Sequence, residues 1–184
     1  LRQWHGLRAV GLDLSWHLLA EGRGADRAPA AIQGRAEALP IGDGRLAAVF
    51  SECLLSLLVD PAAALDEWQR VLAPAGFLIV SDLYARSRRR VCGQSPPSVH
   101  CCLAGAVPRE ILLERFRAAG FSVLVWEDHT PLLKQLAARL VWAHGSLEAF
   151  WESAGAGCTG SQNSSGGKPG YYLMVACKGG AERG

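Results

Sequence analysis

The chain has 184 residues, of which 49% are hydrophobic, and a formal net charge of +2 at pH 7. This length and apolar content predict one domain with a sizeable core, and so small a charge argues against a nucleic-acid-binding protein. No stretch is long and apolar enough to cross a bilayer and no signal peptide is visible, so we expect a cytoplasmic protein without membrane contact.

The first part of the chain predicts two short strands separated by a helix. Residues 7–12 favour a strand that ends at Asp13, the helix that follows ends at Gly22, and residues 30–33 favour a weak strand. The chain begins with Leu1 rather than methionine and enters a strand almost at once. We therefore interpret it as an N-terminally truncated fragment.

Residues 46–84 predict a strand, a helix and a second strand in one continuous unit. The apolar runs at 47–50 and 77–80 are typical of buried parallel strands. Between them, Asp60 is a good N-cap and Pro61 suits the first helical position. Pro74 and Gly76 are expected to stop this helix, whose apolar residues recur at spacings of three and four on one face, namely Leu65, Trp68, Val71 and Leu72.

The remaining elements continue the alternation of helix and strand. We expect a helix from Pro108 to Gly120, a strand at 121–126, and a helix that starts at Thr130 and stops at Gly145, followed by a short helix capped by Ser146. The apolar side of the helix that starts at Thr130 is formed by Leu132, Leu133, Leu136, Leu140 and Val141. Residues 154–170 predict a flexible Gly/Ser-rich loop before a last strand at 171–177. Such alternation predicts an α/β fold with a parallel sheet, helices on both faces, and ligands at the carboxyl ends of the strands.

The segment RVLAPAGFLIVSD at 70–82 resembles the RVLxPGGxLxxSD segment of class I S-adenosylmethionine-dependent methyltransferases. The resemblance implies a single Rossmann-like domain over residues 1–184, a mostly parallel sheet, and S-adenosylmethionine as cofactor. The chain lacks a counterpart of that family's first strand and glycine-rich loop. Ala75 stands where the family has its first glycine, which we expect to matter little because only one turn position needs a positive φ.

Two further segments resemble the family's cofactor-binding motifs. GLDLS at 11–15 resembles GxDxS, which implies that the carboxylate of Asp13 binds the ribose hydroxyls, although Asp13 is equally placed to cap the next helix. GRAEALPIGDG at 34–44 resembles the adenine-flanking GDAEALPFPDG, with Arg35 in place of an aspartate, so that one side-chain acceptor is lost. The predicted cofactor-binding residues are Asp13, Leu14, Arg35, Ala36, Glu37 and Ser51.

The six cysteines favour buried thiols, metal or metalloid ligands, or redox chemistry over a disulfide scaffold. SECLLSLLVDP at 51–61 resembles the SNCVxNLxPD segment of arsenite methyltransferases, and CLAGAV at 102–107 resembles their CxGGAL segment. The cysteines of these two segments, Cys53 and Cys102, are 49 residues apart (102 − 53), as in that family. Taken alone, Cys53 is better interpreted as a small buried residue, whereas the matched pair favours a ligand role.

The resemblance therefore implies an enzyme that methylates trivalent arsenic, a soft acceptor that thiolates hold best. Cys53 and Cys102 are the predicted catalytic and metalloid-binding residues, with Cys158, or alternatively Cys101, as a third ligand and Cys177 in the core. Two other functions stay open: a methyltransferase for another small molecule, and a non-catalytic protein that binds a metalloid through thiols. The predicted partner is a small-molecule or metalloid substrate, and the sequence predicts no particular oligomeric state.

Overall fold

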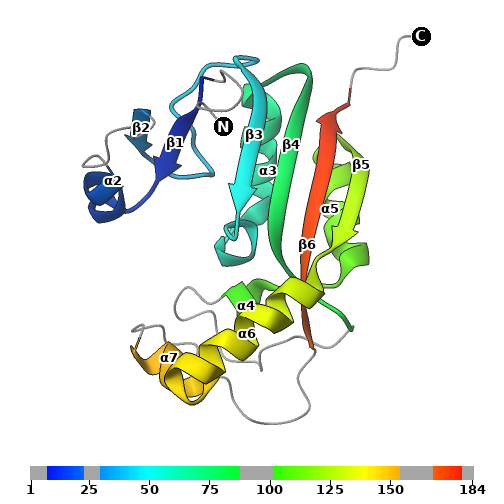
Figure 1. The fold of residues 1–184 in the computed structure, drawn as a ribbon. Coiled ribbons are helices and arrows are strands. Elements are labelled where there is room, and N and C mark those ends of the chain that lie inside the picture. Colours follow the sequence, from blue (N-terminus) through cyan, green and yellow to red (C-terminus); the bar gives the residue numbers. More distant parts are fainter. Residues whose placement is uncertain (1–7, 23–29, 88–101, 154–167, 180–184) are drawn as a thin grey trace.

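The computed structural model describes residues 8–22, 30–87, 102–153 and 168–179 (Figure 1). Most of the predicted loop at 154–170 lies outside this part of the chain. The described elements are β1 (Val10–Asp13), α2 (Trp16–Gly22), β2 (Ala30–Gln33), β3 (Leu46–Glu52), the 3-10 helix η1 (Leu55–Leu57), α3 (Pro61–Val71), β4 (Leu72–Ala85), α4 (Cys102–Gly105), α5 (Arg109–Ala118), β5 (Phe121–Asp128), α6 (Thr130–His144), α7 (Leu147–Ser153) and β6 (Pro169–Lys178).

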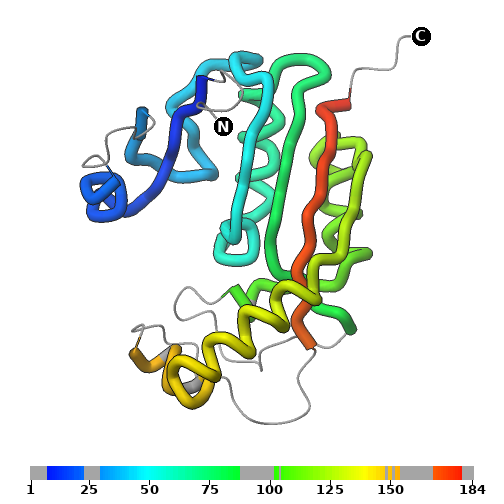
Figure 2. Tube along the Cα trace, viewed as in Figure 1, coloured from blue at the N-terminus to red at the C-terminus, as the bar shows by residue number. Residues whose placement is uncertain are grey.

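The described strands form two sheets. β1 and β2 pair in parallel, and a four-stranded sheet has the order β3-β4-β6-β5 (Figures 1 and 2). In the larger sheet β3 and β4 are parallel, whereas β6 runs antiparallel to both β4 and β5. Three of its strands therefore point the same way, which confirms the predicted α/β fold. The carboxyl ends of β3 and β4 meet at one edge of the sheet.

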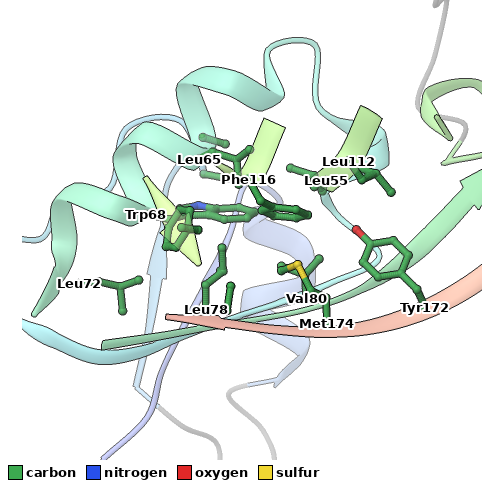
Figure 3. Packing of buried hydrophobic residues seen from close by; sticks show 14 of the residues in the cluster. Leu55, Leu65, Trp68, Leu72, Leu78, Val80, Leu112, Phe116, Tyr172 and Met174 are labelled. Atoms are coloured by element: carbon green, nitrogen blue, oxygen red, sulfur yellow. The ribbon is translucent and has the colours of Figure 1, made fainter. Parts of the chain in front are cut away.

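The core lies between one face of the larger sheet and helices α3 and α5 (Figure 3). α3 begins as predicted, since the Asp60 side chain accepts a hydrogen bond from the Ala63 amide at 3.0 Å. The core is contributed by fully buried side chains of both layers, among them Leu65, Trp68, Leu78, Val80, Phe116, Tyr172 and Met174. This packing holds the edge that carries the carboxyl ends of β3 and β4 in place.

The expectation of a fully buried strand at 47–50 is wrong. β3 is an edge strand of the sheet as described, and Phe50 is 50% exposed. Phe77 of β4, also half-exposed, alternates with Leu78, which is buried against α3 and α5. Because successive strand residues point to opposite faces, these strands are buried on one face only.

Helix α6 forms at the predicted place, but its predicted apolar side is not buried. Leu132 and Leu136 are more than half exposed. The buried residue of the helix is Thr130 at its start, whose hydroxyl accepts a hydrogen bond from the Tyr171 amide at 3.2 Å. The helix is thus joined to β6 by its first turn, and Gly145, with φ +84°, ends it as predicted.

The turn between α3 and the rest of β4 departs from expectation at Ala75. The helix ends at Val71, before Pro74, and Ala75 itself has φ +60°. Gly76 is required for a different reason: a Cβ there would lie 2.9 Å from the Ala73 carbonyl oxygen and 3.2 Å from that of Ala47. The substitution of the family's first glycine therefore falls on the residue in the left-handed conformation, where a Cβ is unfavourable.

We expect Ala75→Gly to raise the free energy of unfolding by about 1 kcal/mol. The left-handed conformation costs a residue with a Cβ about 1–2 kcal/mol, and the larger conformational entropy that glycine loses on folding offsets only part of this gain. The matched variant Gly76→Ala should lower it, since its Cβ would press on backbone atoms. Urea unfolding of the three proteins measures both effects. An unchanged or lower stability for Ala75→Gly would contradict the strain at this turn.

Candidate active site

Cys53 lies immediately after β3, at the carboxyl edge of the larger sheet. Its φ of +49° is unusual for a residue other than glycine, and its amide donates to the Ser81 carbonyl of β4 at 2.8 Å. The side chain is exposed, and its Sγ lies 3.7 Å from the Tyr171 hydroxyl of β6. A backbone in this conformation, held by the neighbouring strand, presents the thiol at the edge where ligands of such sheets bind.

Cys102 is brought to the same edge by α4, a single helical turn that packs on η1 and β4. Its thiol is half-buried. Burial raises the pKa of Cys102, and the negative charges of Asp82 and Cys53 raise it further. Burial also raises the pKa of Cys53, against the opposing effect of its hydrogen bond with Tyr171. Both thiols are therefore mainly protonated at neutral pH.

Asp82 lies beneath this edge and is 1% exposed. Its carboxylate accepts hydrogen bonds from the Ser56 amide at 2.8 Å, the Ser56 hydroxyl at 2.6 Å and the Leu83 amide at 2.6 Å. Burial nevertheless raises the pKa of Asp82, because desolvation outweighs these bonds. The sequence analysis assigned Asp82 no role, although an acidic residue within the apolar run FLIVSDLY was the available signal.

Asp13 occupies the carboxyl end of β1. Its Oδ1 accepts a hydrogen bond from the Ser15 amide at 2.7 Å, whereas α2 is capped by Ser15, whose hydroxyl accepts from the Leu18 amide at 3.4 Å. Within the described residues Oδ2 has no hydrogen-bond partner. A carboxylate with one oxygen free at the end of a strand fits the hydroxyl groups of a ribose, which are donors. The bond to the Ser15 amide and ribose binding are thus compatible.

The other predicted cofactor residues lie around the ends of β1, β2 and β3. The Gly34 amide donates to the Asp13 carbonyl at 3.1 Å, which brings the loop after β2 beside Asp13. Leu14 is 61% exposed, whereas Ala36 and Ser51 are buried. The Ser51 hydroxyl has no hydrogen-bond partner in the described part of the chain. Arg35 and Glu37 form an exposed ion pair at 3.4 Å, so Arg35 is drawn to its neighbour in the loop.

Glu67 and Arg70 of α3 hold this loop, a role that the sequence analysis did not predict. Glu67 accepts a hydrogen bond from the Leu39 amide at 2.6 Å, and Arg70 donates to the Ile41 carbonyl at 2.9 Å and to the Leu39 carbonyl at 3.3 Å. The two side chains also pair with each other, and Arg70 pairs with Asp43. Their mutual hydrogen bond lowers the pKa of Glu67 and raises that of Arg70. Helix α3 thus fixes the loop that carries Ala36 and Glu37.

The remaining cysteines have different positions. Cys158 and Cys101, the candidates for a third ligand, lie outside the described residues. Cys177 is half-buried on β6 rather than in the core. In the parts of the chain that the structure describes, no group of three or more His, Cys, Asp and Glu side chains is suited to a metal ion. Nor does any helix there have the length and apolarity needed to cross a membrane.

Comparisons with known proteins agree with this geometry. Residues 1–80 match the methyltransferase domain family Methyltransf_11. The chain is similar to the structure of the [4+2]-cyclase SpnF, with 24% identity and a TM-score of 0.66 over 97% of this chain and 68% of that one. It is also similar to CrArsM, an arsenic(III) S-adenosylmethionine methyltransferase from Chlamydomonas reinhardtii, with 22% identity and a TM-score of 0.55 over 95% of this chain.

A third similar structure is phosphoethanolamine N-methyltransferase 2 from Haemonchus contortus in complex with S-adenosyl-L-methionine, with 18% identity and a TM-score of 0.70 over 97% of this chain. The chain spans 56% of the length of the algal protein and 45% of the nematode one.

The fold is that of class I methyltransferases, and residues 1–80 match the model of a methyltransferase domain. S-adenosylmethionine is the cofactor of this class, so the predicted kind of enzyme and its cofactor are confirmed. The narrower resemblance to arsenite methyltransferases stays a prediction, because the algal enzyme is one of several similar structures. The individual site residues also stay predictions.

We expect Glu67→Gln to destabilise the protein at neutral pH, because the variant cannot pair with Arg70 as a charged group. The folded-state pKa of Glu67 is lowered from its ordinary 4.5, so its contribution is present above about pH 4.5 and is lost as the pH falls through the lowered value. The stability difference between wild type and variant should shrink over that range. Urea unfolding as a function of pH measures it.

Glu114→Gln is the matched control for this prediction, since Glu114 is exposed on α5. Its difference from wild type should be small and nearly constant over the same range. A Glu67→Gln difference that does not change with pH would show that the ion pair with Arg70 contributes nothing to stability.

Proposed function

We propose that this protein transfers a methyl group from S-adenosylmethionine to trivalent arsenic bound by Cys53 and Cys102. The observation that carries this proposal is that α4, which begins at Cys102, packs on η1, which follows Cys53, so that cysteines of two distant segments, one exposed and one half-buried, lie at the carboxyl edge of β3 and β4. Ligands of α/β sheets bind at this edge. The similarity to an arsenic methyltransferase of known structure supports the same assignment.

The state of the thiols suits this substrate. Because the pKa values of Cys53 and Cys102 are raised, both groups carry their protons at neutral pH. Arsenous acid, As(OH)₃, condenses with two thiols to form two S–As bonds, and each thiol proton leaves with an arsenic hydroxyl as water. The step balances without a general base. Thiol sulfur is a soft ligand, which carboxylate oxygen and imidazole nitrogen do not replace at a soft centre.

The bound cofactor supplies an electrophilic methyl group on a sulfonium sulfur. With the cofactor bound, its methyl would pass to the lone pair of the thiol-held arsenic and the C–S bonding pair would remain on the cofactor's sulfur, so the transfer would need no external oxidant or reductant. The protein's part is to hold donor and acceptor in line. We assign the ribose to Asp13, the adenine side to residues 35–37, the acceptor to Cys53 and Cys102, and a third arsenic ligand to Cys158 or Cys101.

A second candidate is methylation of another small molecule, with the cysteines in a packing role. It is supported by the range of acceptors among the similar structures, which include a phosphoethanolamine and a geranyl diphosphate methyltransferase. A third is thiol binding of a metalloid without catalysis. The cysteine and Asp13 experiments below separate the three, since only the first requires both thiols and cofactor.

We expect Asp13→Asn to weaken binding of S-adenosylmethionine about 10- to 100-fold. A hydrogen bond to a charged group contributes about 1.5–3 kcal/mol, and about 1.4 kcal/mol corresponds to a factor of ten. Asparagine keeps an oxygen for the Ser15 amide, so this turn is retained while the charge is lost. Calorimetric titration measures the affinity. Asp60→Asn, at the cap of α3, is the control and should leave affinity unchanged.

We expect Cys53→Ser and Cys102→Ser each to abolish methylation of arsenite without unfolding the protein. Serine is nearly isosteric, but its hydroxyl is a poor ligand for a soft centre. The measurement is methylated arsenic formed from arsenite, a thiol reductant and labelled S-adenosylmethionine, with a melting curve for each variant.

Cys177→Ser is the matched control, because Cys177 lies half-buried on β6 among residues that are not assigned to the site. It should keep full activity. Full turnover by Cys53→Ser and Cys102→Ser would overturn the arsenic assignment and favour another small-molecule acceptor. Arsenite binding without methyl transfer, in protein that does not bind S-adenosylmethionine, would favour the non-catalytic function.

A further inference from the structure

The closest approach between the two cysteine-bearing segments is made by a glycine. Gly105, the last residue of α4, lies against the backbone of Ser56 in η1. A Cβ placed on Gly105 would be 1.8 Å from the Ser56 carbonyl oxygen, 2.7 Å from its carbonyl carbon and 3.1 Å from its Cα. All three are backbone atoms, which cannot rotate away as the end of a side chain can. In this position only glycine is compatible with the observed packing.

The Ser56 side of this contact is firmly held. Its amide and its hydroxyl both donate to the carboxylate of Asp82, at 2.8 and 2.6 Å. Asp82 is itself buried in β4 and also accepts from the Leu83 amide. Displacing Ser56 would remove two donors from a buried carboxylate, which is costly. Any strain created at residue 105 is therefore relieved by movement of α4 rather than of η1.

The contact also lies close to both thiols along the chain. Cys53 precedes Ser56 by three residues (56 − 53), and Cys102 precedes Gly105 by three (105 − 102). The Cys53 amide donates to the Ser81 carbonyl of β4, and the Ser56 amide donates to Asp82 of the same strand. The segment from Cys53 to Ser56 is therefore held rigidly against β4. Cys102 belongs to the single helical turn that ends at Gly105. The Gly105–Ser56 contact is thus the point at which one thiol is placed relative to the other.

We propose that Gly105 is a positioning residue whose contact with the Ser56 carbonyl sets the separation of Cys53 and Cys102. This role concerns the same site as the proposed function and rests on it for the identity of the ligand. An alanine Cβ would have to retreat by about 1.2 Å, from 1.8 Å to the 3.0 Å below which Cβ contacts essentially do not occur. A shift of about 1 Å between groups that must act on one centre costs about 100-fold.

Thiol bridging tests this role without any methylation assay. Dibromobimane becomes strongly fluorescent only after it has alkylated two neighbouring thiols, whereas monobromobimane reports single thiols. Both are applied to protein in which Cys92, Cys101, Cys158 and Cys177 are serine. We expect Gly105→Ala to slow bridging at least tenfold and to leave the single alkylation rates of Cys53 and Cys102 unchanged. A merely structural role would change both probes or neither.

Gly22→Ala is the matched control, because a Cβ on Gly22, at the end of α2, has no atom within 4 Å. It should bridge at the unsubstituted rate. If Gly105→Ala does not fold, Ser56→Ala serves instead: it keeps the carbonyl but loses the hydroxyl bond to Asp82, and bridging should slow by a smaller factor. Unchanged bridging in folded Gly105→Ala, or in Ser56→Ala where that variant replaces it, overturns the proposal.

The two proposals fail separately. Slowed bridging in Gly105→Ala, combined with no methylation of arsenite by the unsubstituted protein, supports the positioning role and overturns the proposed function. Unchanged bridging in Gly105→Ala, combined with methylation of arsenite by the unsubstituted protein, overturns the positioning role and supports the proposed function.

Discussion

The arrangement of the candidate site depends on the buried carboxylate of Asp82. Three hydrogen bonds join it to Ser56 and Leu83, and through them β4 is joined to η1 and to the segment that carries Cys53. Its raised pKa means that ionisation costs stability in the folded protein, so this group favours folding most at low pH and less as the pH rises through the folded-state pKa. A hydrophobic residue of similar size would avoid that cost. What Asp82 contributes is position, because it holds η1 in the place against which Gly105 and α4 pack.

A second set of charged side chains does the same for the other half of the site. Glu67 and Arg70 project from α3, which belongs to the core of the larger sheet, and bind the backbone of the loop after β2. That loop is joined to β1 through the bond from the Gly34 amide to the Asp13 carbonyl. Side chains of α3 thus join the strand pair that carries Asp13 to the sheet that carries Cys53. The predicted cofactor side and the predicted acceptor side of the site are therefore held by polar contacts as well as by the apolar core.

The elements were predictable from the sequence to the extent that local signals determine them. The cap at Asp60 and the stop at Gly145 depend on neighbouring residues only, and both occur where predicted. Burial was less predictable. The apolar pattern of α6 and the run at 47–50 indicated buried surfaces, yet Leu136 and Phe50 are about half exposed, because burial depends on what packs against a face. A similar limit applies to Ala75, whose positive φ occurs in a turn where the next residue, Gly76, lies close to the Ala47 carbonyl of the neighbouring strand.

The difference between local sequence signals and long-range contacts also explains why the fold alone does not identify the methyl acceptor. A protein whose structure is titled a [4+2]-cyclase has this fold, as do methyltransferases for arsenic and for phosphoethanolamine. The shared part is the sheet with its helices, which apolar periodicity encodes. The proposed acceptor site lies in the segment after β3 and in α4, which are short and pack on each other through contacts such as that of Gly105 with Ser56. Because these contacts pair residues some fifty positions apart (105 − 56 = 49), they leave no periodic signal in the sequence. They depend instead on one glycine, Gly105, and one buried carboxylate, Asp82, neither of which belongs to the apolar pattern that encodes the sheet.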